Sequence, residues 1–277
     1  MTDADVPFAD AVRSMAGWNQ TMNDWRRFLQ AEPEGCFLAE WDGIPVGTAT
    51  TICYGTELAW IGMVLVHPDF RRRGIGTALL EQCLQYLQSK KIQCIKLDAT
   101  PQGKEVYDKL GFKDEWTLTR WSNPSIACSG PIAKLSCVVN SSNLCSVKRL
   151  DTMAFGVSRF HLLEALSRQS TASIFLKNTL GDVDGYGFIR AGTRAFYLGP
   201  IVAISTEVAL NIVEYLLAQH AGQPVYWDIP DPNHSLTLWA QQHGFTAQRQ
   251  LIRMHLGENH KPGCPAMQIA LTAPETG

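Results

Sequence analysis

The 277-residue sequence predicts an α/β fold, a mixed sheet with helices, made of two tandem modules of the same design. Short apolar runs typical of strands alternate with segments whose apolar residues recur every three or four positions, as in amphipathic helices. The order of these segments in the first half recurs in the second half. In the first half, one strand and one helix meet at a junction rich in glycine and arginine, which predicts an anion-binding site there.

Composition argues against several classes of partner. Apolar residues make up 45% of the chain, and 24 lysines and arginines face 26 acidic residues, for a net charge of -2. This balance gives no electrostatic footprint for nucleic acid or for an acidic membrane surface. The first ten residues carry three aspartates and no apolar leader, and the central apolar runs are too short to span a bilayer. We therefore expect a cytoplasmic monomer or homodimer that binds neither nucleic acid nor membrane.

The eight cysteines indicate buried thiols and no metal site. They are scattered along the chain without any C-x-x-C pair, and several fall within apolar segments. Buried free thiols are typical of proteins in a reducing compartment. Because the spacing of zinc ligands is absent, we expect no metal.

Periodicity in the first half predicts alternating helices and strands. The hairpin is expected to turn at Asp42-Gly43, and the last helix to end at Gly111, a typical glycine after a helix C-terminus. In chain order the expected elements are a helix over 21–30, a hairpin over 35–55, a strand over 60–66, a helix over 79–87, a strand over 93–99 and a helix over 104–110.

The second half repeats this order and aligns with the first at its end. The aligned pairs are Asp98 with Asp228, Tyr107 with Trp239, Gly111-Phe112 with Gly244-Phe245, and Arg120 with Arg253. Its expected elements are a helix over 159–169, a hairpin over 172–192, a strand over 194–203, a helix over 207–220, a strand over 224–230, a helix over 235–245 and a closing strand. Serine, proline and asparagine are enriched over 122–146, which places the boundary near residue 140 and predicts modules 1–140 and 141–277.

The junction after the strand 60–66 has the chemistry of a diphosphate site. A helix that opens directly after a strand leaves its first backbone N–H groups unpaired, and the helix dipole adds positive potential. Gly74 and Gly76 let a bulky anion approach the backbone, and three arginines at 71–73 add charge. A Walker loop would need a lysine followed by serine or threonine, and a dinucleotide fingerprint would need a third glycine where Leu79 stands.

The residues Arg71, Gly74 and Gly76 match the pattern R-x-x-G-x-G, preceded by the lead-in Val-His-Pro at 66–68. With these residues the segment resembles the pyrophosphate-binding loop of the GNAT superfamily of N-acetyltransferases. The motif "VYDKLGF" at 106–112, after the next strand, is also similar to that family. Two features depart from the family pattern: no first strand precedes the N-terminal helix, and residues 100–103 replace an asparagine that many relatives carry.

The resemblance implies an acetyl-coenzyme A-dependent N-acetyltransferase that transfers the acetyl group directly to a primary amine. It implies that the coenzyme is held by Val64, Leu65, Val66, Arg71, Arg72, Arg73, Gly74, Ile75, Gly76 and Thr77. Tyr107 is the natural general acid for the departing thiolate, although it could instead be a packed core residue. Asp98 could accept the amine proton, although such an aspartate more often caps a turn or pairs with an arginine.

The resemblance also places Trp18, Asn19 and Gln20 in the acceptor site, with Trp18 equally plausible as core. We expect Asp228 near that site and only one acetyl-coenzyme A per chain, because the second half lacks the glycine–arginine loop and carries Glu207 near its helix start. The acceptor stays open: a small-molecule amine or a peptide amine. The alternative functions are a non-catalytic acyl-coenzyme A sensor and a protein adaptor without cofactor affinity.

Overall fold

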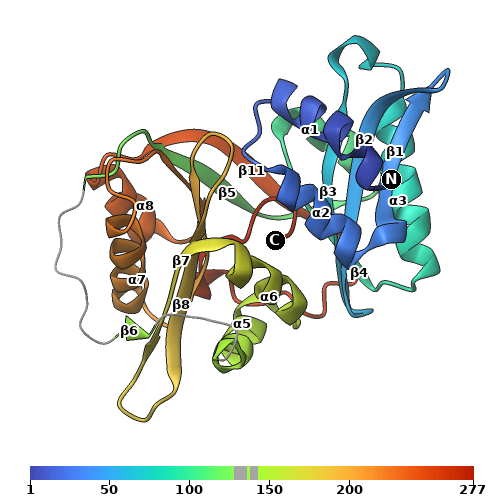
Figure 1. Cartoon of the computed structure of the whole chain (residues 1–277). Helices are drawn as coiled ribbons and strands as arrows, with labels where there is room; N and C mark the ends of the chain where they lie inside the picture. Colours follow the sequence, from blue (N-terminus) through green and yellow to red (C-terminus); the bar gives the residue numbers. More distant parts are fainter. Residues whose placement is uncertain (128–135, 138–142) are drawn as a thin grey trace. The chain divides into compact units, whose positions relative to one another are not determined.

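The computed structural model describes residues 1–127, 136–137 and 143–277, and these form two compact units (Figure 1). Unit 1 comprises Met1–Asp114, Met254–His260 and Pro274–Gly277. Unit 2 comprises Glu115–Arg253 and Lys261–Ala273. The boundary expected near residue 140 lies outside the described residues and stays a prediction.

Unit 1 follows the predicted order of helices and strands, with one addition. Its elements are α1 (Val6–Met15), α2 (Met22–Ala31), β1 (Cys36–Trp41), β2 (Ile44–Tyr54), β3 (Leu58–Val66), α3 (Ile75–Ser89), β4 (Cys94–Ala99) and α4 (Pro101–Lys109). The turn between β1 and β2 has positive φ at both Asp42 and Gly43, as a tight hairpin requires. Helix α1 was not predicted, and no strand precedes it in the described chain.

The sheet of unit 1 runs in the order β1-β2-β3-β4, and the last residues of β11 (Thr246–Gly257) belong to the same unit. The pairs β1–β2 and β2–β3 are antiparallel, whereas β3 and β4 are parallel. Helix α1 packs on β2 and β3 and helix α2 on β2, while α3 contacts β1, β2 and β3 (Figure 1). Residues at odd and even positions of β2 face opposite sides of the sheet: the Thr51 hydroxyl donates to the Gly35 carbonyl on one side, and the Tyr54 hydroxyl donates to the Thr276 carbonyl on the other.

Unit 2 repeats the same succession of elements. They are β5 (Lys113–Asn123), β6 (Ser136–Cys137), α5 (Lys148–Phe155), α6 (Phe160–Gln169), β7 (Ser170–Lys177), β8 (Val183–Arg190), β9 (Phe196–Ala203), α7 (Thr206–Ala218), β10 (Val225–Pro230), α8 (His234–Gln242), β11 and β12 (Gln268–Ala270). The sequence predicted the elements from α6 to β11 and did not predict β5, α5 or β12. Its strand order is β11-β5-β10-β9-β8-β7-β6, with β12 paired to β9.

The final strands of the two sequence repeats, β5 and β11, are each divided between the two compact units. Residues 115–123 of β5 belong to unit 2, where β5 pairs antiparallel with β10. Residues 254–257 of β11 belong to unit 1. Most of β5 thus leaves its own repeat for unit 2, and only the last residues of β11 join unit 1. Periodicity cannot reveal this division because it reports elements and not their pairing.

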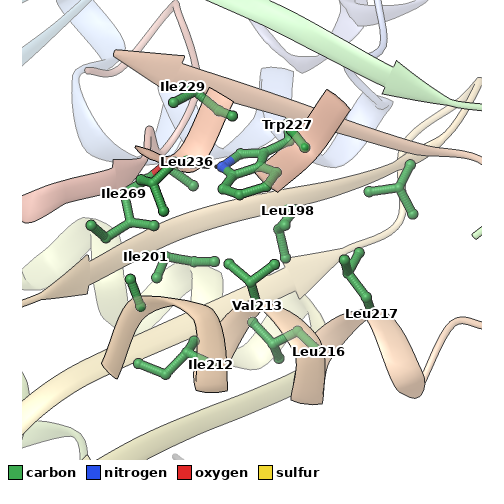
Figure 2. Packing of buried hydrophobic residues seen from close by; sticks show 14 of the residues in the cluster. Leu198, Ile201, Ile212, Val213, Leu216, Leu217, Trp227, Ile229, Leu236 and Ile269 are labelled. Carbon is green, nitrogen blue, oxygen red and sulfur yellow. Dashed lines mark hydrogen bonds between the residues drawn. The ribbon is translucent and has the colours of Figure 1, made fainter. Parts of the chain in front are cut away.

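The core of unit 2 is formed where α7 packs on the sheet. Figure 2 shows Ile212, Val213 and Leu216 of α7 pointing toward Leu198 and Ile201 of β9. All are fully buried, and so is Trp227 of β10, whose indole N–H donates to the Ile269 carbonyl at 3.0 Å. This hydrogen bond satisfies the polar atom that burying a tryptophan would otherwise leave unpaired.

A buried ion pair fixes β5 against β10 within unit 2. The Arg120 guanidinium donates to both oxygens of Asp228, at 2.8 and 2.6 Å, and the Tyr197 hydroxyl donates to Oδ2 at 2.8 Å. Burial by itself would raise the pKa of Asp228, but the adjacent guanidinium holds that pKa below its usual value. The carboxylate therefore stays charged and contributes stability at neutral pH.

We expect Asp228→Asn to lower the free energy of unfolding by about 3–5 kcal/mol at pH 7, because it leaves a buried guanidinium without its carboxylate. The pKa of Asp228 is lowered on folding, so its contribution is complete above the unfolded pKa of about 3.9 and is lost as pH falls through the folded pKa. Urea unfolding should therefore show the difference from wild type shrinking below about pH 4. The exposed Asp182→Asn is the control, and an equal loss in both variants would contradict the assignment.

Candidate active site in unit 1

The central feature of unit 1 is the separation of two parallel strands, β3 and β4. They pair only where residues 58–60 face residues 94–96, although β3 continues to Val66 and β4 to Ala99. The register of β3 against β2 also shifts between Thr48 and Thr50, and Met63 has a positive φ of 52°. These features together form a bulge that redirects the strand just before the three residues predicted to hold the coenzyme arm.

The three predicted arm-binding residues lie on the unpaired end of β3. Leu65 is buried, whereas Val64 and Val66 are partly exposed. Since β4 no longer pairs with β3 here, the backbone on this side of the strand is open to a partner other than β4. An extended thioester arm is the kind of ligand that backbone groups in such an opening hydrogen-bond.

The loop over residues 67–74 leads from β3 into α3 and leaves the start of the helix open. Gly74 is the N-cap in a left-handed conformation with φ 82°, and among the described residues no side chain caps the helix. The first intrahelical bond joins the Ala78 N–H to the Gly74 carbonyl at 3.0 Å. The N–H groups of Ile75, Gly76 and Thr77 therefore have no partner within the helix.

The two glycines of the loop serve different purposes. Gly74 has a positive φ that side chains rarely adopt, so its glycine is conformational. At Gly76 a Cβ would meet only Val66 Cγ2 at 3.8 Å, an ordinary contact. Packing within the protein gives no reason for glycine at 76, and this leaves open space over the helix N-terminus for an approaching anion.

The three arginines are exposed beside this helix start. Arg71 Nε donates to the Val66 carbonyl at 3.2 Å, and an Arg73 Nη2 donates to the Asp69 carbonyl at 3.3 Å. Arg73 also lies over the rings of Trp41 and Phe70, at 5.4 and 5.2 Å. These contacts orient two of the guanidinium groups without neutralising them, so their charge remains available to an anion.

Tyr107 lies on α4, which follows β4. Its ring packs edge-on against Phe112 at 6.0 Å, and its hydroxyl has no hydrogen-bond partner among the described residues. Burial, with a smaller effect from Cys83, raises the pKa of Tyr107 to about 12. The phenol is therefore protonated at neutral pH and is a donor without an acceptor inside the described chain.

Asp98 lies near the end of β4, two residues before the N-cap of α4, and it is partly exposed. That cap is Thr100, whose hydroxyl accepts from the Gly103 N–H at 3.2 Å, with Pro101 as the first helical residue. The sequence that replaces the family asparagine thus starts a helix by ordinary capping chemistry.

Trp18, Asn19 and Gln20 lie in the turn between α1 and α2. Arg13 Nη1 donates to the Trp18 carbonyl at 3.0 Å and bonds Asp10 through its other nitrogens, which fixes the turn. Asn19 and Gln20 are buried, whereas Trp18 is partly exposed. These hydrogen bonds therefore hold the turn in place, and the side-chain amides of Asn19 and Gln20 point into the protein.

Asp228 has a place that differs from the sequence prediction. The residue is fully buried in unit 2, and both of its oxygens are already bonded to Arg120 and Tyr197. This carboxylate is fully buried and already accepts three hydrogen bonds, so it is not accessible to a substrate amine, and we assign Asp228 a structural role. Its counterpart in the first repeat, Asp98, is not equally enclosed.

In unit 2 the strands that correspond to β3 and β4 are β9 and β10, and a further strand of the chain, β12, lies beside β9. Strand β10 pairs with β9 only over residues 225–227, and beyond them β12 pairs with β9 at Ile201 and Val202. The Leu271 N–H also donates to the Asp228 carbonyl at 3.2 Å. In unit 2, β12 thus pairs with β9 beyond the point where β10 leaves it, whereas in unit 1 no described strand other than β2 pairs with β3 beyond residue 60.

The start of α7 in unit 2 is closed as well. Ser205 is its N-cap, and the Ser205 hydroxyl accepts from the Val208 N–H at 3.3 Å. Glu207 lies in the first turn, where its charge complements the helix dipole. A capped and acidic helix start is a poor site for a diphosphate.

Sequence reasoning missed Gly62, Met63 and the strand β12. Gly62 carried a usable signal, because an isolated glycine within an apolar strand is typical of a bulge or a close approach of another backbone. Strand β12 carried none, since it is only three residues long and lies between Pro265 and Pro274.

Comparison with known proteins agrees with this architecture. The model of the acetyltransferase (GNAT) family matches residues 7–112, and that of the acetyltransferase (GNAT) domain matches residues 147–265. The uncharacterized N-acetyltransferase YitH of Bacillus subtilis is 31% identical over 183 residues, which cover 65% of this chain and 63% of the relative. Holothin acyltransferase of a Pseudoalteromonas species is 25% identical over 253 residues, 88% of this chain and 84% of the relative.

Solved structures extend the likeness to the whole fold. A crystal structure from Pyrococcus horikoshii, assigned to the acetyltransferases, has a TM-score of 0.85 at 25% identity and covers 100% of this chain and 94% of that one. A tandem GNAT protein from the clavulanic acid biosynthesis pathway has a TM-score of 0.64 at 14% identity, covering 92% and 95%, which shows the shared fold.

The chain belongs to the GNAT superfamily of N-acetyltransferases and has two GNAT modules in tandem. Both the predicted family and the predicted fold class are thereby confirmed. Within the described part of the chain, no helix has the length and apolar character needed to cross a membrane.

Proposed function

We propose that unit 1 is the catalytic unit and that it transfers the acetyl group of acetyl-coenzyme A directly to a primary amine. One observation carries this proposal: unit 1 has both an uncapped helix start at α3 and two strands, β3 and β4, that diverge. In unit 2 the start of α7 is capped by Ser205, and β12 pairs with β9 beyond the residues that pair with β10. Catalysis and cofactor binding are thus assigned to the same unit.

The residues present fit a diphosphate and a thioester arm. The open N–H groups at the start of α3 and the space above Gly76 suit the diphosphate, and Arg71, Arg72 and Arg73 supply charge around it. Val64, Leu65 and Val66 would hydrogen-bond the arm through their backbone. A backbone N–H near the bulge at Met63 would polarise the thioester carbonyl.

Acetyl-coenzyme A supplies the acetyl group as a thioester; a carbon–nitrogen bond forms as the carbon–sulfur bond breaks. Tyr107 would donate its phenolic proton to the departing sulfur, a role that suits a group protonated at neutral pH and without an internal acceptor. Asp98, or a water chain beside it, would accept the proton that the amine releases.

Acetyl transfer through a cysteine of unit 1 is a less favourable route than direct attack by the amine. Burial raises the pKa of Cys36 and of Cys53 to about 12, so both are protonated at neutral pH and weak nucleophiles. Direct attack by the amine within a ternary complex therefore requires fewer charged species than transfer through a cysteine.

The first variant tests the cofactor loop. We expect Gly76→Val to weaken acetyl-coenzyme A binding at least about tenfold in calorimetry, because the side chain fills the open space above the helix start. The matched control is Thr206→Val at the first position of α7, which should leave affinity unchanged. Unaltered affinity in Gly76→Val, with a thermal unfolding midpoint equal to wild type, would refute the loop assignment.

The second variant tests the proton donor. We expect Tyr107→Phe to lower kcat roughly 100-fold while leaving the Kd of acetyl-coenzyme A nearly unchanged, because only the proton transfer is lost. Stopped-time measurement of coenzyme A release gives kcat, with Tyr215→Phe on α7 as the control for losing a tyrosine hydroxyl. Wild-type turnover in Tyr107→Phe would make Tyr107 a packing residue.

A further inference from the structure

The segment over residues 274–277, here called the tail segment, is embedded in unit 1. Glu275 and Thr276 are 4% and 1% exposed. Polar residues so deeply buried normally have specific partners. The tail segment is therefore bound as a ligand would be, and the residues that hold it can be read as a binding site.

Three side-chain donors bind the tail segment. The Tyr54 hydroxyl donates to the Thr276 carbonyl at 2.7 Å, and the Trp60 indole N–H donates to the Pro274 carbonyl at 2.9 Å. Gln20 Nε2 donates to the Glu275 carboxylate at 2.7 Å. The donors thus take two main-chain carbonyls, two residues apart, and the side-chain carboxylate between them.

Gly62 of β3 makes room for the middle of the tail segment. A Cβ at position 62 would lie 2.6, 2.7 and 2.8 Å from the Cβ, carbonyl oxygen and Cα of Glu275. The tail backbone therefore lies directly on β3, one residue before the bulge at Met63. We call Gln20, Tyr54, Trp60 and Gly62 the tail-binding residues.

Several buried polar atoms around the tail segment remain unsatisfied. Gln20 Oε1, Thr50 Oγ1 and Thr276 Oγ1 are buried without a hydrogen-bond partner in the described structure. Thr50 pairs with Gly62 across β2 and β3, so it shares the face on which Glu275 lies. Buried unsatisfied atoms are uncommon in a tightly fitted structural contact. Here the oxygens of Gln20 and Thr50 are acceptors that the tail segment does not use, and the Thr276 hydroxyl is a group of the tail segment that this surface leaves unpaired.

We propose that the tail-binding residues form a peptide-binding acceptor site, and that the tail segment occupies it in cis, so that an acceptor must displace it. This proposal rests on the proposed function and names its substrate class. Gln20 belongs to the turn predicted to line the acceptor site, and Gly62 adjoins the segment proposed to hold the thioester. The occupant itself indicates the preferred ligand: an extended peptide whose carbonyls alternate with a carboxylate side chain.

Weakening the tail segment should open this site. In Glu275→Ala the charge-assisted bond to Gln20 is lost, so a labelled pentapeptide of residues 273–277 should bind at least about tenfold more tightly than to wild type, measured by fluorescence anisotropy. The same peptide with alanine in place of its glutamate should bind more weakly. Glu258→Ala, which removes an exposed carboxylate of unit 1, should behave as wild type.

Acetyl-transfer kinetics give an independent readout on the full-length protein. Glu275→Ala should lower the KM of a peptide acceptor with no change in the KM of acetyl-coenzyme A, and the free pentapeptide should inhibit competitively against the acceptor only. Glu275→Gln, which keeps the volume and one oxygen acceptor, should give a smaller change and covers the case in which Glu275→Ala fails to fold.

Equal peptide binding to wild type and both variants, or inhibition competitive with acetyl-coenzyme A, would overturn the proposal. Failure of the proposed function looks different: wild type would transfer no acetyl group to any amine. The anisotropy measurement needs no turnover and would still decide whether the tail-binding residues bind peptide.

Discussion

The divergence of β3 from β4 is the constraint on which the rest of the site depends. Paired strands satisfy each other's backbone, and β3 and β4 do so only over residues 58–60 and 94–96. The bulge at Met63 then directs β3 away from β4. The strand is followed by a loop and the uncapped helix α3. Backbone groups along one strand end and one helix start are thereby left for a ligand.

The second repeat shows what happens when the same divergence is closed. Strand β12 pairs with β9 where β10 leaves it, and Ser205 and Glu207 complete the start of α7. Unit 2 keeps its core, with α7 packed on β7, β8 and β9, and it also has the buried Arg120–Asp228 pair. A duplicated fold can therefore keep its packing after its binding surface has been filled by its own chain.

Local sequence patterns predicted the helices and strands well, but they did not predict which distant strands pair with one another. Apolar periodicity and the Asp42-Gly43 turn located the strands and helices of unit 1, and R-x-x-G-x-G located the open helix start, because both depend on neighbouring residues. The placement of β5 and β11 depends on pairing between distant segments, which leaves no local trace. Asp228 was misplaced for the same reason: only the fold shows that Arg120 lies opposite it.

Hydrogen–deuterium exchange with and without acetyl-coenzyme A tests the central claim most directly, since it reports backbone protection along the whole chain in one experiment. Binding to unit 1 alone predicts slower exchange over residues 63–77, where the diverging strand leads into α3, and no change over residues 201–210 at the start of α7. Protection over 201–210, or none over 63–77, would contradict the assignment of cofactor binding to the first unit.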